Sequence, residues 1–348
     1  MEILIGLLII AVGSFCQSSS YVPIKMVREW SWESFWLTQG LFAWLVFPFL
    51  GALLAVPEGH SLCELLTAEN SFAIGMTVLF GALWGVGGLT FGLSMRYLGV
   101  ALGQSISLGT CAGLGTILGP VMLHLVAPEA GHLEKLTLSV LMGVVATLIG
   151  IAIIGVAGGM KAAALSEEEK QQAVKDFNFP KGILIALLAG VMSGCFNVGL
   201  EFGKELNFGE LTDPMYATLP ATLLVTLGGF ATNAAYCLFQ NAKNRTWSDY
   251  GKVRLWVNNL FFCALAGGLW YSQFFGLSLG KGFLTSSPQL MTFSFCILMA
   301  LNVTFSNLWG ILLKEWKGCS KRTIAVLVVG IVVLIFSTFV PELLNKIL

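Results

Sequence analysis

The sequence predicts an all-α membrane protein whose ten transmembrane helices form two inverted five-helix repeats, and three observations lead to this prediction. The first is composition: 56% of the 348 residues are hydrophobic and only 11% are charged, whereas a soluble domain carries about 25% charged residues. The second is a regular succession of long apolar windows, and the third is a set of segments that occur twice. The formal net charge is zero, so we expect a lipid bilayer as the surroundings and no nucleic-acid partner.

Each transmembrane helix is expected from a window of about 20 apolar residues, the length that crosses a hydrocarbon core about 30 Å thick. The first window follows Glu2, an acidic residue where a signal peptide would have a basic segment, so we expect an uncleaved first helix. Ten windows fit, at 3–24, 34–56, 72–95, 99–124, 136–158, 181–202, 214–239, 255–279, 288–312 and 322–341.

Lysine and arginine are distributed unevenly between the two sides that alternate connections would occupy. Fifteen of the 19 fall in the odd-numbered connections, and the richer side is expected to be cytoplasmic, with both termini outside the inner membrane of a bacterium. In the longest polar connection, 161–181, Ser166 followed by three Glu predicts a short surface helix. The predicted division is a first repeat at 1–160, a cytoplasmic linker at 161–178 and a second repeat at 179–348.

Three pairs of similar segments indicate the repeat. GALWGVGGLTFGLS (81–94) resembles GGLWYSQFFGLS (267–278), Cys16 and Lys25 recur 179 residues later as Cys195 and Lys204, and KLTLSVL (135–141) recurs 186 residues later as KRTIAVL. These matches link helices 1, 3 and 5 with helices 6, 8 and 10 in order. A repeated unit with an odd number of helices must be inverted, as in secondary transporters whose substrate sites lie near mid-membrane. The alternative is chance similarity between helices of like composition.

Polar side chains within the windows are the candidate substrate-binding residues, because polar groups in lipid generally face the protein interior or a water-filled cavity. An indole or phenol ring suits the apolar C–H face of a pyranose, and an amide can both donate to and accept from sugar hydroxyls. Core packing of the Trp side chains and helix–helix hydrogen bonds of the amides are the alternatives. The candidates for a sugar site are Gln17, Tyr21, Trp84, Gln104, Asn197, Trp270 and Gln273.

Proton coupling would need a titratable group whose pKa changes when the site closes. Glu201 is the acid most nearly embedded in a predicted span, on one helix face with Asn197 and one turn from Lys204, and an interfacial salt bridge is its alternative role. Lys25 and Lys204 are the other candidates, although lysines near helix ends often extend to the membrane surface. His124 is a weaker candidate, and sodium coupling through carbonyls and hydroxyls stays open.

Neither metal binding nor catalysis is indicated. The eight Cys are scattered without C-x-x-C spacing and are interpreted as small core residues. His60, His124 and His132 have no H-x-x-x-H or H-x-x-x-x-D pairing, so we expect no metal, no cofactor and no enzyme.

Five segments together resemble the L-rhamnose–proton symporter family, a branch of the drug/metabolite transporter superfamily. They are YVPIK…REWSWE (21–33), GALWGVGGLTFGLSMRYLG (81–99), DPMYATLP (213–220), GGLWYSQFF (267–275) and LLKEW (312–316). The resemblance implies a ten-helix fold of two inverted five-helix repeats and import of a 6-deoxy-sugar, L-rhamnose, together with a proton. It also implies that an amide can replace Glu201, which counts against Glu201 as a universal proton carrier.

The methyl group of a 6-deoxy-sugar would suit an apolar wall, for which Phe91 and the pair Phe274 and Phe275 are candidates. An exporter or exchanger of another small sugar or metabolite on the same scaffold is the alternative function.

Overall fold

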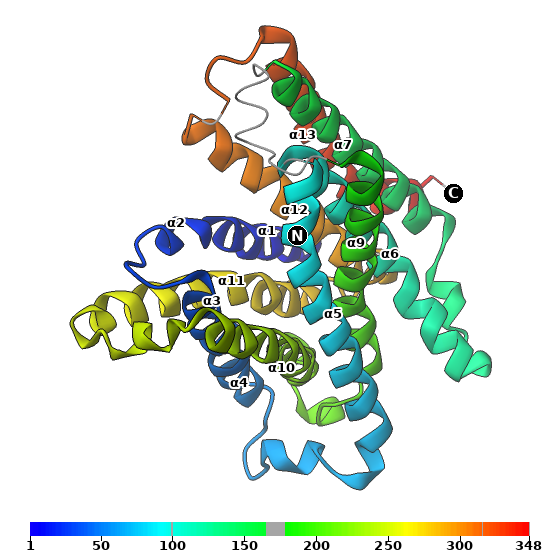
Figure 1. Ribbon diagram of the computed structural model, residues 1–348. Coiled ribbons are helices and arrows are strands. Elements are labelled where there is room, and N and C mark those ends of the chain that lie inside the picture. Colours follow the sequence, from blue (N-terminus) through cyan, green and yellow to red (C-terminus); the bar gives the residue numbers. More distant parts are fainter. Residues whose placement is uncertain (99, 165–177, 315, 348) are drawn as a thin grey trace. The chain divides into compact units, whose positions relative to one another are not determined.

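The computed structural model describes residues 1–98, 100–164, 178–314 and 316–347, and the regular elements in these ranges are all helices (Figure 1). The short surface helix expected after Ser166 lies outside the described residues, as does most of the linker 161–178. The α-helices are α1 (Glu2–Ser19), α2 (Tyr21–Ile24), α3 (Trp32–Leu41), α4 (Phe47–Leu53), α5 (Ser71–Leu98), α6 (Val100–Val126), α7 (Leu138–Ala163), α9 (Phe179–Phe202), α10 (Leu219–Asn244), α11 (Trp256–Gly282), α12 (Pro288–Leu312), α13 (Lys321–Ser337) and α14 (Val340–Asn345).

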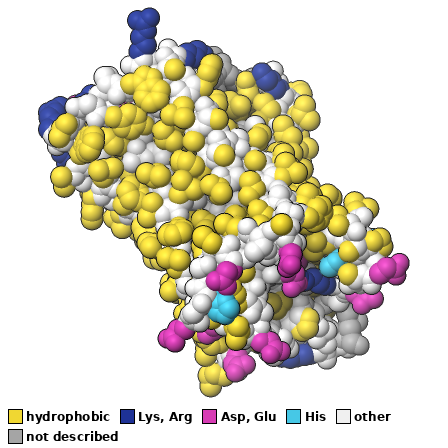
Figure 2. All heavy atoms as spheres, turned by 90° about the horizontal axis from the view of Figure 1, so that it is seen from below, with side chains coloured by type: hydrophobic (Ala, Val, Ile, Leu, Met, Phe, Trp, Pro, Cys, Tyr) yellow, Lys and Arg dark blue, Asp and Glu magenta, His cyan; other side chains and the backbone are white. Residues whose placement is uncertain are grey.

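Nine candidate membrane spans occur in the described part of the chain, so this is a multi-pass membrane protein. Figure 2 shows hydrophobic side chains over much of one face, with the charged side chains grouped away from the widest apolar area. The tenth expected span corresponds to α13, which has 17 residues, fewer than the roughly 20 that cross a bilayer without distortion. The all-helical membrane class is confirmed, and ten spans remain a prediction.

The second expected helix is interrupted by one wide π-helical turn, η1 (Phe42–Val46), between α3 and α4. Pro48 follows this turn, and it has no N–H to donate to the carbonyl of Trp44, with which its ring would clash in a regular α-helix. The wider turn relieves this clash. Such turns occur frequently at functional sites, and this one contains Trp44.

The chain divides into two compact units, and each contains segments from both halves of the sequence. Unit 1 comprises residues 1–85 and 199–283. Within it α1 lies along α11 (Figure 1), and a Cβ on Gly13 would come within 2.6 Å of the Ser272 carbonyl oxygen. Glycine therefore lets these two helix backbones approach closely.

Unit 2 comprises residues 86–198 and 284–348. Its helix α7 packs against α6 and α13, and Thr147 donates a hydrogen bond to the Ser337 hydroxyl at 2.9 Å. A Cβ on Gly150 would lie 2.7 Å from Leu334 Cδ2. Small residues again set the spacing between helices.

Candidate functional site

Three indole rings meet inside unit 1, each from a different expected span. Trp44 from η1 makes edge contacts with Trp84 of α5 and Trp270 of α11, with ring centroids 5.9 Å apart in both pairs. The Trp84 and Trp270 rings are 5.7 Å apart and tilted by 33°. We call Trp44, Trp84 and Trp270 the indole cluster. It brings together the Trp residues of the two similar segments, 81–94 and 267–278.

Glycines one turn before two of these Trp residues allow the helices to approach. A Cβ on Gly81 of α5 would clash with the Val225 carbonyl of α10. A Cβ on Gly267 of α11 would lie 2.8 Å from Phe42 Cβ and 2.9 Å from the Ala43 nitrogen. Both segments therefore use the same arrangement, a glycine against a neighbouring helix and a Trp one turn later.

Unpaired buried polar atoms occur in unit 1, and one of them belongs to the indole cluster. Trp44 Nε1 of the cluster, Gln39 Oε1 of α3 and the Tyr271 hydroxyl of α11, which faces Gly51 of α4, are buried and have no hydrogen-bond partner among the described residues. Gln273 is 3% exposed, and its Nε2 donates to the Trp270 carbonyl at 3.1 Å. Buried polar groups are nearly always paired, so the unpaired atoms are suited to a polar ligand.

The cluster is anchored to α10 by a neighbouring ring. Trp36 contacts Trp44 edge-on at 5.6 Å, and its Nε1 donates to Asn233 Oδ1 at 3.0 Å. Asn233 in turn donates to the Gly229 carbonyl at 2.9 Å. This amide therefore ties α3 to α10.

The other sequence candidates of unit 1 lie away from these contacts or make different ones. Gln17 is half-buried and accepts a 3.4 Å hydrogen bond from Ser18, whereas Tyr21 is 53% exposed. Lys25 is exposed. Lys204 lies 3.7 Å from Glu205.

Gln104 and Asn197 belong to unit 2. Gln104 is half-buried near the start of α6. Asn197 is 3% exposed and donates to the Gly115 carbonyl at 2.9 Å, which joins α9 to α6. Its Oδ1 has no partner among the described residues, so this amide also keeps an acceptor that a ligand could use.

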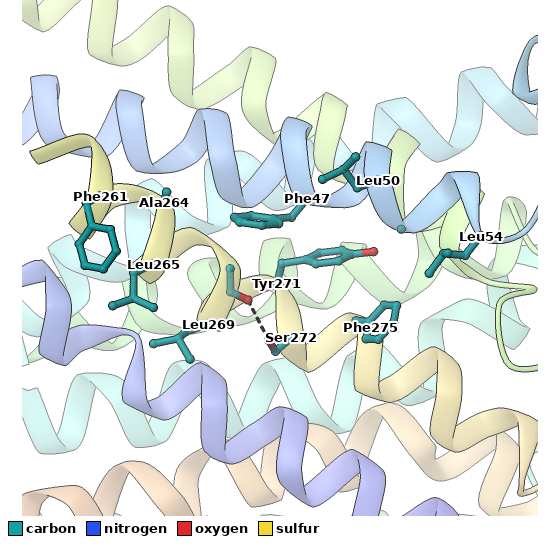
Figure 3. Close-up of a pocket in the computed structure, with 12 residues that line it drawn as sticks. Phe47, Leu50, Leu54, Phe261, Ala264, Leu265, Leu269, Tyr271, Ser272 and Phe275 are labelled. Atoms are coloured by element: carbon teal, nitrogen blue, oxygen red, sulfur yellow. Dashed lines mark hydrogen bonds between the residues drawn. The ribbon is translucent and has the colours of Figure 1, made fainter. Parts of the chain in front are cut away.

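Of the expected apolar wall, Phe274 packs against Trp270 at a centroid distance of 5.3 Å. Phe275 lines an open groove of about 700 Å³ between α4 and α11 instead (Figure 3). The groove is also lined by Phe47, Leu50, Gly51, Leu54, Phe261, Ala264, Leu265, Gly268, Leu269, Tyr271 and Ser272. Because this lining is almost entirely apolar, the groove suits hydrocarbon rather than a sugar.

Three functional candidates were missed by the sequence analysis. Gln39 and Trp44 lie in the apolar window 34–56, whose sequence indicates a transmembrane helix but no binding residue. The third is Glu33, which is 6% exposed and more deeply buried than the half-buried Glu201. That Glu201 is the acid most nearly embedded in a span stays a prediction. Among the described residues no group of three or more His, Cys, Asp or Glu could hold a metal ion.

Comparison with known proteins identifies the family. The model of the L-rhamnose-proton symport protein (RhaT) family matches residues 1–344. An L-rhamnose-proton symporter of Salmonella typhi is 31% identical over 339 residues, covering 94% of this chain and 93% of that protein. One from Yersinia pestis (strain Pestoides F) is 31% identical over 349 residues and covers 96% of each chain. These proteins are named for transport, so the expectation of a transporter rather than an enzyme is confirmed. The chain belongs to the L-rhamnose-proton symport protein family.

Proposed function

We propose that this protein imports L-rhamnose together with a proton across the bacterial inner membrane. Membership of the L-rhamnose-proton symport family supports the substrate and the coupling ion. Nine candidate spans among the described residues agree with a carrier embedded in the bilayer. The single observation that carries the proposal is the indole cluster, in which Trp44 Nε1 is buried and has no partner among the described residues.

The sugar is proposed to bind against the indole cluster. Its apolar C–H face would lie on the ring of Trp84 or Trp270. Trp44 Nε1 would donate to one sugar hydroxyl, and Gln39 Oε1 would accept from another. Phe274, packed on Trp270, is the apolar neighbour suited to the methyl group. Gln17, Tyr21, Gln104, Asn197 and Gln273 remain proposed contributors from the sequence.

The proposed architecture is a drug/metabolite transporter-like fold of ten helices, with inverted repeats at 1–160 and 179–348 joined by a cytoplasmic linker at 161–178. Paired contacts support it: Gly81 approaches Val225 on α10, and its counterpart Gly267 approaches Phe42 and Ala43 on η1. Both termini are proposed to lie outside, because fifteen of the 19 Lys and Arg would then face the cytoplasm. Transport would proceed by alternating access, as the two repeats rock about the site.

Uptake of labelled L-rhamnose into membrane vesicles tests this function. We expect faster uptake and accumulation when the outside is more acidic, and loss of accumulation after an uncoupler is added. An uptake rate that is the same with and without the proton gradient would contradict proton coupling. Absence of uptake would contradict L-rhamnose as the substrate. Competition by a panel of other sugars and metabolites tests the alternative of an exporter or exchanger of a different compound.

A further inference from the structure

A buried carboxylate that the sequence analysis did not select lies at the start of α3. Glu33 is 6% exposed and falls inside the candidate span Trp32–Leu53. Ionisable groups within membrane spans are costly, and by default they indicate a functional role. Glu201, Lys25 and Lys204 are each less buried than Glu33.

The hydrogen-bond partners of Glu33 are neutral. Asn244 Nδ2 and Thr246 Oγ1 donate to Glu33 Oε1 at 3.0 and 2.9 Å. Among the residues described by the structure, Glu33 makes no ion pair. A buried carboxylate paired with a cation is fixed in its charged form, but one held by an amide and a hydroxyl can gain and lose a proton without leaving a partner charge behind.

The Thr246 hydroxyl has one proton and two acceptors. Its oxygen lies 2.9 Å from Glu33 Oε1 and 2.8 Å from Asn241 Oδ1. The Asn241 amide orientation is fixed because its Nδ2 donates to the Cys237 carbonyl at 3.1 Å. Asn241 Oδ1 also accepts from Ser34 Oγ at 3.0 Å, so it keeps a donor whichever way the Thr246 hydroxyl turns.

Both protonation states of Glu33 therefore satisfy this network. When Glu33 is ionised, the Thr246 O–H donates to its carboxylate. When Glu33 is protonated, its own O–H can donate to the Thr246 oxygen, and the Thr246 O–H turns to Asn241 Oδ1. Rotation of one hydroxyl accommodates the change, so no buried donor or acceptor loses its partner.

Charged and titratable groups face Glu33 from neighbouring elements. Asp249 of η7 (Thr246–Gly251) is close enough to interact with Glu33 electrostatically. Lys252 is bound to Asp249 at 2.9 Å, so that cation is already paired. The Tyr250 hydroxyl donates to the Ser34 carbonyl at 3.3 Å, and the Cys237 thiol faces Glu33 from α10.

Glu33 is connected to the indole cluster through α3 and α10. Trp36 lies one turn further along α3, contacts Trp44 and is bonded to Asn233 of α10. Asn233 and Asn241 are two turns apart on one buried face of α10. A change in charge at Glu33 therefore acts on α3 and α10, the two helices that position Trp36 against Trp44.

We propose that Glu33 takes up and releases the symported proton, with Asn244 and Thr246 as its positioning residues. The proton binds to the Glu33 carboxylate when the sugar is bound and leaves it on the cytoplasmic side, so one proton crosses with each loaded cycle. This inference rests on the proposed function, since it concerns the coupling ion of that transport.

Proteoliposomes separate coupling from sugar binding. L-rhamnose counterflow exchanges labelled for unlabelled sugar without net proton movement, whereas accumulation in a pH gradient needs the proton. A gradient of one pH unit supports up to about tenfold accumulation at one proton per sugar, because each pH unit corresponds to a factor of ten in proton activity. We expect Glu33→Gln to retain counterflow and to lose accumulation. Glu29→Gln, an exposed acid four residues away that pairs with Arg254, should retain both.

Two further variants test the assignment even if Glu33→Gln does not fold. Glu33→Asp keeps a carboxylate and should still accumulate L-rhamnose, with an altered pH dependence of uptake. Thr246→Val removes the shared hydroxyl and should also shift that pH dependence, while counterflow persists. Accumulation by Glu33→Gln, or unchanged pH profiles in both Glu33→Asp and Thr246→Val, would overturn the proposal. Absence of L-rhamnose counterflow in the wild-type protein would instead contradict the proposed function itself.

Discussion

Two polar regions of unit 1 are connected through α3 and α10 but differ in how their polar atoms are paired. Trp44 Nε1 of the indole cluster and Gln39 Oε1 of α3 are buried without a partner among the described residues. Around Glu33, the side chains of Ser34, Asn241, Asn244 and Thr246 are joined in a continuous hydrogen-bonded network. Unpaired buried groups are costly unless a ligand completes them, whereas a paired network can hold a charge. The first region is suited to a sugar and the second to a proton.

The largest expected effect comes from forcing apart the helices that carry the indole cluster. Gly81→Val would push side-chain atoms into the Val225 carbonyl, and backbone cannot move aside as a flexible side chain can. Overpacking typically costs about 1–3 kcal/mol and sometimes more, so we expect a large loss of folded protein. Folded yield and melting temperature in detergent measure this. Gly88→Ala, where an added Cβ meets nothing within 4 Å, should leave both unchanged.

The next largest effect should follow from removing a polar atom that faces the sugar. Gln39→Leu deletes the unpaired Oε1 acceptor and leaves a sugar hydroxyl without a partner. Such a loss costs about 1–3 kcal/mol, or roughly 5- to 150-fold in affinity. We expect KM for L-rhamnose to rise within this range while thermal stability holds or increases. A KM equal to that of the wild-type protein would show that Gln39 does not bind the sugar.

A smaller effect should result from Trp84→Phe, which keeps an aromatic ring but reduces its area. Aromatic contacts contribute about 0.5–1.5 kcal/mol beyond burial, so we expect KM to rise by about twofold to twelvefold. Trp316→Phe is the matched control, because Trp316 contacts Lys161 in unit 2. Equal KM changes in the two variants would show that ring size matters generally rather than at the cluster.

The smallest expected effect concerns Asp249, next to the Glu33 network, and depends on pH. Burial by itself raises the pKa of the Asp249 carboxyl, but hydrogen bonds from the Ser31 N–H and the Lys252 ammonium outweigh it and lower this pKa. A carboxyl with a lowered pKa stabilises the fold above its unfolded value, about 3.9 for Asp, and this contribution disappears as pH falls through the folded pKa. The melting temperature should therefore decrease below about pH 4.

Asp249→Asn should be less stable than the wild-type protein at neutral pH and should show a weaker decrease in acid. A parallel decrease in both proteins would mean that other carboxyls dominate acid unfolding.

The sequence predicts most of the membrane architecture because long apolar windows translate directly into spans. The window 255–279 agrees with α11 (Trp256–Gly282), and 136–158 agrees with α7 (Leu138–Ala163). The π-helical turn of η1 is not predicted. Pro48 indicates that one backbone hydrogen bond is lost, but it does not indicate which backbone conformation replaces the regular α-helix there.

The site is predicted only in part. Trp84 and Trp270 attract attention because they repeat in similar segments, and the structure brings them together. Gln39 and Trp44 have no such signal, since neither lies in a repeated segment and the rings of Trp84 and Trp270 meet Trp44 from other helices. Glu33 immediately precedes the apolar window that starts at residue 34, so the sequence places Glu33 in the loop before that predicted span. Its burial depends on Asn244 and Thr246, more than 200 residues away.

The most direct test of the indole cluster as the sugar site is an experimental structure of the protein with L-rhamnose bound. We expect the sugar ring to lie against Trp84 or Trp270, with hydroxyls bonded to Trp44 Nε1 and the Gln39 amide. L-rhamnose bound elsewhere, with the three indoles in contact only with one another, would contradict the account.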